Sequence, residues 1–573
     1  MADTGDRVTR KYKNFRGVDF RGEECSLNRS PDSLNVWRNY KNLASIETRP
    51  ALEHIYTHHE GMIRNMKWHN GKLYFIAQDG FLHALNKDGT VEWEIILVHF
   101  SSCLFEFNGK LYAMGQTGIF NVTDRCEVEP FIPTTTIGRK PSGGGTVYQD
   151  VNMLTSRRIN TFLADGTSKT YHLDTKDITS EQIIVKVNGE VVSGAKYAIS
   201  YAEGRILFQE APPAPLTDGQ DNVSIEFGTK SNNRFKILGC SIVQEFDNRI
   251  FVSGNSNYPS TIWHCSLNDV SYFSDLDYYV DGVDQAPIRS MVSGNNGLWV
   301  FRDSTVNSVF YHQPALDDEY GKVYPSSHSS IALGCVGRAI NFNDDIVFFS
   351  ERGMEGASTD VTTEQFVTHR SSLVDRKMLA HSRYKFMILA EWEGYLLVFM
   401  GGDVYLADSR AVLTNENHIE YEWYHWKLGD YQVNCVEVHD GVLYIGAYKS
   451  STEGHIYSFT REAKNGDEHV NTTTPIKSYW TTPKDVFGAP NMLKTTNKKG
   501  CVVEATGDVA VSVKTDKDDA YELIGTNEGI ADYFVSRIKR KKFKDIQMKF
   551  ESETSFSLEA ASLECFVGGY IKR

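Results

Sequence analysis

A β-hairpin turn that recurs at almost constant intervals is the feature that most restricts how this chain can fold. Each occurrence is a polar two-residue turn, Asn-Gly or a close relative, flanked by β-forming segments such as KWHNGKLYFIA and VEVHDGVLYIG. Such residues are typical of type I′ turns, in which both central residues need a positive φ. The turns begin at Asn70, Asn108, Asp247, Asn296, Asp344, Glu393 and Asp440.

The intervals between the last five turns are 49, 48, 49 and 47 residues. A repeat of about 40 to 50 residues is the length of a four-stranded propeller blade. The sequence therefore predicts an all-β protein built on a β-propeller of about seven blades. The two earlier intervals, 38 and 139 residues, fit compact first blades followed by an insertion. An array of β-sandwiches with coincidental turn spacing is the alternative.

Changes in sequence character divide the chain into five predicted parts. The insertion opens with three consecutive glycines, residues 143–145, which are typical of a flexible joint, and its short strands predict a small immunoglobulin-like β-sandwich. Strongly alternating segments at the end of the chain predict a second β-sandwich. The parts are an N-terminal arm (1–60), the first part of the propeller (61–140), the inserted sandwich (141–232), the remainder of the propeller (233–483) and the C-terminal sandwich (484–573).

Composition favours a protein that is soluble and folds in a reducing cytosol. The net charge of −14 argues against a protein that coats nucleic acid over its whole surface, but it allows a local basic patch or an acidic channel through which DNA slides. The nine cysteines contain no Cys-x-x-Cys pair, so neither a disulfide framework nor a zinc site is expected. No apolar run resembles a signal sequence or a membrane anchor.

Motifs of catalysis and cofactor binding are missing from the sequence. It has no HExxH, GxSxG or GxGxxG pattern, so we expect no enzyme and no cofactor. The stretch HIYTHHEG offers His58, His59 and Glu60 to a metal, but adjacent strand residues point to opposite faces and no metal site is expected. Acidic residues of the SDLDYYVDGVDQ loop are expected to be solvated rather than paired as in a glycosidase.

The N-terminal stretch RSPDSLNVWRNYKNLASIETRP is polar and fits no simple hydrophobic period. We expect this arm to run along the propeller, with Trp37 docked in a pocket and Arg49, next to Pro50, paired with a carboxylate of a blade or of a neighbouring subunit. These three residues are the predicted assembly contacts. The alternative is intramolecular: the arm supplies a strand that closes the last blade.

The segment RIKRKKFK carries six cations within eight residues. In an extended segment they line both faces, which suits phosphate contacts, an interface with an acidic partner, or a strand whose lysines protect it from aggregation. The sequence does not decide among DNA contact, a protein interface and a solvated strand. The cations are Arg537, Lys539, Arg540, Lys541, Lys542 and Lys544.

Segments from several parts of the chain resemble known bacteriophage proteins. The stretches SPDSLNVWRNYKNLASIETRPAL, NMLTSRRINTFLADGTSKTYHL, SRIKRKKFKDIQMKF and FSLEAASLECFVGGYIKR resemble the packaged-DNA stabilisation proteins of phages. The stretches NYPSTIWHCSLNDVSYFSDLDYY and SMVSGNNGLWVFRDSTV resemble the tail nozzle or tail hub proteins of short-tailed phages.

This resemblance implies a structural role in the virion, with assembly in the host cytoplasm. Nozzle proteins form a homo-oligomeric ring, commonly of six copies, below the portal and adaptor rings and beside other tail proteins. The ring continues the channel for double-stranded DNA, retains the packaged DNA and opens for ejection. The competing hypothesis is a glycan-binding or glycan-cleaving propeller, such as a phage adhesin or a sialidase-like enzyme.

Overall fold

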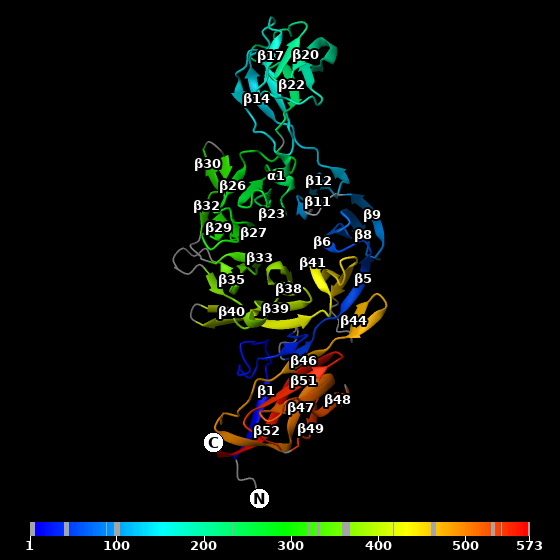
Figure 1. The fold of residues 1–573 in the computed structure, drawn as a ribbon, viewed down its shortest axis with the longest axis vertical. Helices are drawn as coiled ribbons and strands as arrows, with labels where there is room; N and C mark the ends of the chain where they lie inside the picture. The colour runs from blue at the N-terminus through cyan, green and yellow to red at the C-terminus, as the bar shows by residue number, and fades with distance from the viewer. Residues whose placement is uncertain are drawn as a thin grey trace. The chain divides into compact units, whose positions relative to one another are not determined.

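The computed structural model describes residues 6–38, 45–87, 89–96, 103–231, 233–318, 321–328, 333–357, 367–415, 418–459, 466–528, 533–539 and 541–570. Within them the helices are short, namely α1 (Arg234–Leu238), α2 (Asp375–Met378) and two 3-10 turns, and strands dominate (Figure 1). The all-β prediction is therefore confirmed. None of these helices has the length and apolar character needed to cross a membrane.

The chain divides into two compact units. The larger unit comprises Met1–Ile96 and Leu333–Arg573, and the smaller unit comprises Leu97–Ala332. Within the described residues, seven four-stranded antiparallel sheets are distributed over the two units.

The predicted hairpin turns each join the first two strands of one of these sheets. The first residue of every turn has a φ between 47° and 54°, and the second also has a positive φ, as type I′ turns require. Two turns begin one residue earlier than expected, at Asn295 and Asn343, because the flanking strand pairs are Gly294–Gly297 and Phe342–Asp345.

The larger unit holds four of the sheets. Their strands are β6 (Ile63–His69), β7 (Lys72–Ala77), β8 (Phe81–Leu85) and β9 (Val91–Ile96); β33 (Cys335–Phe342), β34 (Asp345–Ser350), β35 (Gly353–Ala357) and β36 (Val367–His369); β37 (Ile388–Trp392), β38 (Tyr395–Met400), β39 (Asp403–Asn415) and β40 (His418–Lys427); and β41 (Gln432–His439), β42 (Val442–Tyr448), β43 (Gly454–Phe459) and β5 (Leu52–His58). The first strands of neighbouring sheets pack together: β33 against β37, β37 against β41, and β41 against β6. Apolar clusters fill the spaces between these sheets.

The smaller unit holds the other three sheets. Their strands are β10 (Cys103–Phe107), β11 (Lys110–Gly115), β12 (Gly118–Asn121) and β13 (Cys126–Glu127); β23 (Ile242–Phe246), β24 (Arg249–Ser253), β25 (Thr261–His264) and β26 (Tyr278–Val280); and β27 (Ile288–Gly294), β28 (Gly297–Arg302), β29 (Val309–His312) and β32 (Ser326–His328). The first strand β23 packs against β10 on one side and β27 on the other.

The predicted insertion contains two sheets that share one apolar core. The larger sheet has the order β15-β14-β16-β22-β18-β19, and the smaller has the order β17-β21-β20. Phe162, Tyr171, Ile206 and Ile225 are buried between them. The strands are β14 (Thr134–Arg139), β15 (Thr146–Val147), β16 (Arg157–Phe162), β17 (Thr170–His172), β18 (Ile184–Val187), β19 (Glu190–Val191), β20 (Tyr197–Ser200), β21 (Arg205–Phe208) and β22 (Val223–Gly228).

The C-terminal strands belong to one 11-stranded, nearly closed, barrel-like sheet rather than to two separate sheets of a sandwich. Its C-terminal members are β46 (Ser478–Thr481), β47 (Met492–Thr515), β48 (Glu522–Glu528), β49 (Tyr533–Ser536), β50 (Lys542–Phe543), β51 (Ile546–Ser552) and β52 (Phe556–Tyr570). The long strand β47 pairs with β52 up to Gly507 and with β51 from Ala510 onward. Gly507 has a φ of 82°, and a Cβ there would lie 2.3 Å from the Ser555 carbonyl oxygen, so glycine is required where β47 changes partner.

Four strands from the expected N-terminal arm complete this sheet. β1 (Asp6–Lys13) and β4 (Ile46–Thr48) pair with β52, β2 (Ser33–Leu34) pairs with β46, and β3 (Val36–Trp37) pairs with β4. Burial of Val503, Val511, Phe550 and Leu563 forms the core that these strands enclose. The first and last parts of the chain therefore form one structural element.

Candidate functional site

The N-terminal residues 16–38 and 45–58, here called the closing segment, lie against the last two four-stranded sheets of the larger unit. The amide of Val18 donates to the Trp423 carbonyl oxygen at 2.7 Å. A Cβ on Gly17 would lie 1.9 Å from that same oxygen, so only glycine allows the two backbones to approach this closely. The first contact of the closing segment with β40 thus depends on the main chain.

A buried carboxylate on β40 binds two arginines of the closing segment. Arg29 donates from Nη2 to Glu422 Oε1 at 2.6 Å and from Nε to Oε2 at 3.3 Å, and Arg16 donates to the same Oε1 at 3.2 Å. Because the Glu422 side chain is fully buried, these charge-assisted hydrogen bonds compensate the cost of removing it from water. Sequence inspection did not single out this pair, whose members are separated by 393 residues.

Trp37 lies in an aromatic cluster formed by its own chain. Its ring is stacked on Trp392 at a centroid distance of 5.8 Å, meets Trp426 edge-on at 5.5 Å and is tilted against Tyr395 at 5.3 Å. The Trp37 side chain is buried within the apolar cluster between the β37–β40 sheet and the β41–β43 sheet. Its large apolar surface therefore anchors the closing segment at this junction.

Arg49 uses its whole guanidinium group in buried hydrogen bonds. Nη1 and Nη2 donate to Asp467 Oδ1 and Oδ2 at 2.9 and 2.5 Å, a bidentate pair. Nε donates to Asn35 Oδ1 at 3.1 Å, and the remaining donors reach the carbonyl oxygens of Pro50 and Lys427. The Arg49 side chain is 1% exposed, so Arg49 and Asp467 form a buried ion pair within the chain and not a surface contact.

Pro50 connects Arg49, a member of this buried ion pair, to strand β5. Asp467, which holds Arg49, also accepts a hydrogen bond from the Leu52 amide at 2.9 Å. From Leu52 onward, β5 pairs antiparallel with β43 and becomes the fourth strand of the β41–β42–β43 sheet. The closing segment thus supplies the strand that the intramolecular alternative expected, and Trp37 and Arg49 contact partners within the same chain.

Among the described residues of the basic segment, only Lys542–Phe543 form a strand, β50. Phe543 is buried, whereas Lys542 and Lys544 are exposed. Lys541 donates to Asp518 at 2.9 Å and approaches Glu522 at 2.7 Å. Although burial of Lys541 opposes it, these two carboxylates raise its pKa.

The other cations of this segment divide into paired and exposed groups. Lys539 lies 3.3 Å from Glu522, while Arg537 is exposed, and Arg540 lies outside the described residues. Part of the basic charge is therefore neutralised within the chain. The exposed cations Arg537, Lys542 and Lys544 remain the candidates for contacts with an acidic partner or with DNA.

His58 lies beside two side chains that the sequence does not place near it. Its Nε2 is 3.0 Å from Asp79 Oδ2, and His83 Nε2 is 3.0 Å from the same oxygen. These groups could hold a metal ion, since their ligand atoms all lie within 4.8 Å of one another. His59 instead points outward and contacts Glu453, so adjacent residues do face opposite ways. Asp79 and His83 follow β7 in the stretch QDGFLH, and the short spacing between this aspartate and histidine is the sequence signal that could have indicated them.

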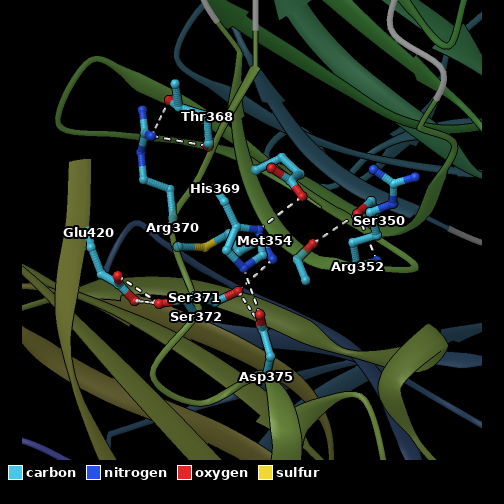
Figure 2. A network of polar contacts seen from close by, with 12 residues as sticks. Ser350, Arg352, Met354, Thr368, His369, Arg370, Ser371, Ser372, Asp375 and Glu420 are labelled. Carbon is cyan, nitrogen blue, oxygen red and sulfur yellow. Dashed lines mark hydrogen bonds and ion pairs between the residues drawn. The ribbon is translucent and has the colours of Figure 1, made fainter. Parts of the chain in front are cut away.

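His369 on β36 lies between two carboxylates, as Figure 2 shows for its Asp375 side. Its Nε2 is 2.6 Å from Asp375 Oδ2 and its Nδ1 is 3.0 Å from Glu355 Oε1. Burial of the ring opposes protonation, but the two hydrogen-bonded carboxylates outweigh burial and raise the pKa of His369 to about 10. Ser371 Oγ donates to Asp375 rather than to the imidazole, so the serine–histidine contact of a hydrolase triad is not formed.

Two aspartates of the acidic loop have structural partners. Asp281 accepts from His312 Nε2 at 2.9 Å, and both side chains are 1% exposed. Asp284 binds the buried guanidinium of Arg302. Both contacts hold the segment between β26 and β27 in place.

The remaining aspartates of that loop lie near Asp150. Although 38% of the Asp277 side chain is exposed, partial burial and the neighbouring Asp150 carboxylate raise the pKa of Asp277 to about 6. Burial, followed by the Asp150 charge, also raises the pKa of Asp275. The expectation of a solvated loop is wrong for Asp281, which is buried, and for Asp277, because partial burial and the Asp150 charge favour the protonated form of Asp277.

Exposed large apolar side chains concentrate in the smaller unit. Of 20 such side chains among the described residues, 15 lie between Leu97 and Ala332. In the inserted sandwich, Leu216 is 98% exposed and Val191 is 68% exposed. Along strand β26, Tyr278 and Val280 are both exposed, and no other strand of the described chain pairs with the outer edge of β26. Exposed apolar groups and unpaired strand edges are typical of protein–protein contact surfaces.

Comparison with known proteins gives no family for this chain. No family model matches it, and no curated protein matches it. Among solved structures, it is similar to the computationally designed Ika8 protein, with 10% sequence identity, 71% of this chain and 99% of that chain covered, and a TM-score of 0.33. At this TM-score the likeness carries no argument about fold or function.

Proposed function

We propose that the seven four-stranded sheets are the blades of one β-propeller and that this chain is a structural protein of a bacteriophage virion. Its copies form a ring at the head–tail junction or tail end. The ring continues the DNA channel, retains packaged double-stranded DNA and gates its ejection. The ring lies next to the portal and adaptor rings and to other tail proteins. We propose six copies per ring, the number common in the nozzle proteins that the sequence resembles.

Three observations support the propeller part of the proposal. The last five sheets follow one another at intervals close to blade length, and a two-residue hairpin turn joins the first two strands of every sheet. Within each unit, the first strands of successive sheets pack against one another, as the inner strands of blades do. Finally, β5 comes from the N-terminal part of the chain and completes the sheet of β41, β42 and β43, which is how a propeller ring is closed by joining the two ends of its sequence.

The observation that carries the ring proposal is the uneven distribution of exposed apolar side chains. In the larger unit, Trp37 and Arg49 are buried in contacts within the chain, whereas the smaller unit exposes residues such as Leu216 and the β26 edge. A ring with cyclic symmetry needs heterologous contacts, in which two different surfaces of each copy meet. We assign one of those two surfaces to the exposed apolar groups that are concentrated in the smaller unit.

Charge supports a passage for DNA without tight binding. The chain has a net charge of −14, which disfavours retention of DNA by broad electrostatic attraction. The basic segment around Lys541 is partly neutralised by Asp518 and Glu522. We therefore assign the exposed cations of this segment to an acidic partner protein rather than to DNA.

The test is the oligomeric state of the purified full chain, measured by native mass spectrometry and negative-stain microscopy, alone and mixed with its adaptor protein. Closed rings are expected. Leu216→Asp and Val280→Lys place charges at exposed apolar positions of the smaller unit and are expected to weaken ring formation while the monomer stays folded.

Val470→Asp is the matched control, because Val470 is exposed to a similar extent as Val280 but lies in the larger unit. Ring formation by Val470→Asp should equal that of the unmodified chain. A protein that stays monomeric at all concentrations and with its adaptor would refute the ring proposal, as would equal effects of all three substitutions.

A glycan-cleaving function is the second candidate, and Asp277 is the observation that favours it. A carboxyl group whose pKa is raised to about 6, near a second carboxyl group, resembles the pair that general-acid catalysis of glycoside hydrolysis uses. Hydrolysis of bacterial surface polysaccharides, lost in Asp277→Asn and retained in Asp303→Asn, would support this function. Absence of hydrolysis by the unmodified chain would eliminate it.

A further inference from the structure

Three side chains from separate positions of the larger unit converge in a buried cluster. His58 is the last residue of β5, Asp79 lies in the turn between β7 and β8, and His83 is on β8. Their side chains are 6%, 7% and 2% exposed. The two Nε2 atoms each lie 3.0 Å from Asp79 Oδ2, close to the roughly 3.3 Å that separates two ligands bound tetrahedrally to one zinc ion.

Each of the three side chains contributes one ligand atom to the cluster, and these atoms all lie within 4.8 Å of one another. Asp79 Oδ1 accepts a hydrogen bond from the Phe81 amide at 2.9 Å, which leaves Oδ2 for the two imidazoles. His83 Nδ1 lies 3.2 Å from a Glu94 carboxylate oxygen but forms no hydrogen bond of acceptable geometry with it, and His83 Nε2 lies 3.0 Å from Asp79 Oδ2.

His58 provides the observation that separates a metal site from a simple hydrogen-bonded triad. Its Nε2 is buried and close to Asp79 Oδ2, yet it forms no hydrogen bond of acceptable geometry with that oxygen or with any other atom. An imidazole nitrogen buried without a hydrogen bond is costly unless another ligand satisfies it. A cation placed between the three groups would accept the lone pairs of both histidines and of the carboxylate.

We propose that His58, Asp79 and His83 bind a divalent transition-metal ion, with zinc as the best match. Two imidazole nitrogens and one carboxylate oxygen are a common zinc ligand set, and a water molecule completes the tetrahedron. Imidazole ligands disfavour magnesium and calcium, which prefer oxygen. Neutral histidines are needed for binding, so zinc affinity should fall as the pH is lowered.

The position of the cluster gives the ion a structural role. His58 belongs to β5, which pairs with β43, while Asp79 and His83 belong to the following sheet of β6 to β9. A bound ion would therefore fasten the end of the closing segment to the next four-stranded sheet. This inference does not depend on the phage function, because a propeller of any function gains from a secured closure.

The experiment uses the purified full chain, treated with EDTA and exchanged into metal-free buffer. After addition of zinc sulfate and gel filtration, elemental analysis should find one zinc ion per chain. Cobalt(II) in place of zinc should give the intense visible absorption of a tetrahedral site. Asp79→Asn and His83→Gln should each lose the tightly bound ion and the cobalt spectrum.

His59→Gln is the matched control, since His59 is the exposed neighbour of His58 and contacts Glu453 instead of the cluster. It should retain one zinc ion and the cobalt spectrum. If the unmodified chain is folded but retains neither zinc nor cobalt, the proposal is overturned. The cluster is then a carboxylate shared by two imidazoles without a metal ion. An equal loss of zinc in His59→Gln and His83→Gln would also overturn it. If the Asp79 and His83 variants fail to fold, zinc should still slow hydrogen exchange of β5 in the unmodified chain, and no change in that exchange would refute the site.

Discussion

Substitution of Arg49 by methionine tests whether the closing segment is locked by its buried ion pair. Methionine keeps an unbranched apolar side chain but removes all five guanidinium donors. Asp467 would then remain buried with its charge uncompensated, holding only the Leu52 amide. Strand β5 should be destabilised first, because the Asp467 carboxylate links Arg49 to the beginning of that strand.

The expected magnitude follows from the burial of the pair. The Arg49 and Asp467 side chains are 1% and 10% exposed, and removal of one member of such a buried pair costs about 3–5 kcal/mol. At about 1.4 kcal/mol for each tenfold change, this cost corresponds to a roughly 100- to 4,000-fold increase in opening of the strand. Lysine at position 49 keeps the charge but not the bidentate geometry, so its effect should be intermediate.

The assay is hydrogen–deuterium exchange read by mass spectrometry on peptides that cover β5 and β43. Exchange protection of both strands should fall by the factor above in Arg49→Met, while Asp467→Asn combined with Arg49→Met should recover part of the loss. Such recovery would show that the isolated carboxylate, and not the missing arginine alone, is responsible.

Lys477→Met is the control, because Lys477 and Glu553 form an ion pair whose side chains are 78% and 66% exposed. An exposed pair of this kind contributes little, so exchange should stay close to that of the unmodified chain. If Arg49→Met changes β5 exchange no more than Lys477→Met does, the reasoning that the closing segment is held by a buried pair is refuted.

Three further predictions concern other parts of the larger unit. Trp37→Ala should lower the free energy of unfolding by about 3–5 kcal/mol, because it leaves a cavity among Trp392, Tyr395 and Trp426. Urea denaturation measures this free energy, and a loss below about 1 kcal/mol would contradict the prediction. Gly507→Ala should lower the free energy of unfolding by about 1–3 kcal/mol, because residue 507 has a positive φ and a Cβ there would clash with the Ser555 carbonyl oxygen. An unchanged urea midpoint would contradict the requirement for glycine where β47 changes partner. The pKa of His369 is raised in the folded chain, so its stabilising effect should be complete below about pH 6.5 and disappear as the pH rises toward about 10. His369→Gln should abolish that part of the pH dependence of unfolding, and identical pH profiles for the two proteins would count against it.

The strand content and the hairpin turns could be predicted because they depend on local sequence. Positive φ at turn residues such as Asn70 and Asp440 follows from residue type alone, and their spacing reports the length of the repeating sheets. The one-residue displacement at Asn295 and Asn343 shows the limit of that reasoning. Where two asparagines or an Asn-Asp pair can both adopt positive φ, strand pairing decides which residue begins the turn.

The role of the first 60 residues could be stated only as two alternatives, because it depends on contacts between distant parts of the chain. Arg49 and Asp467 are separated by 418 residues, and no local pattern links them. Strands β1 to β4 are short or polar, so nothing in their sequence indicates that they complete the C-terminal sheet. The single barrel-like sheet in place of a sandwich has the same origin, since it arises where β47 exchanges one partner strand for another at Gly507.

The candidate metal cluster was missed for a related reason. The sequence presents His58 beside His59 and Glu60, and the strand geometry correctly argues against a site made of neighbours. The actual companions of His58 come from the next sheet, and only the three-dimensional arrangement brings Asp79 and His83 to it. Residues Arg537 to Lys544 show the converse, since a conspicuous run of charge is partly neutralised by carboxylates that precede it in the chain.

Cryo-electron microscopy of the purified full chain, with and without its adaptor protein, tests the central proposal most directly. Closed rings with cyclic symmetry are expected, in which each copy contains a seven-bladed propeller and the smaller unit contributes exposed apolar residues such as Leu216 or Val280 to the subunit contacts. Single particles that remain monomeric under both conditions, or rings whose contacts leave these residues in solvent, would contradict it.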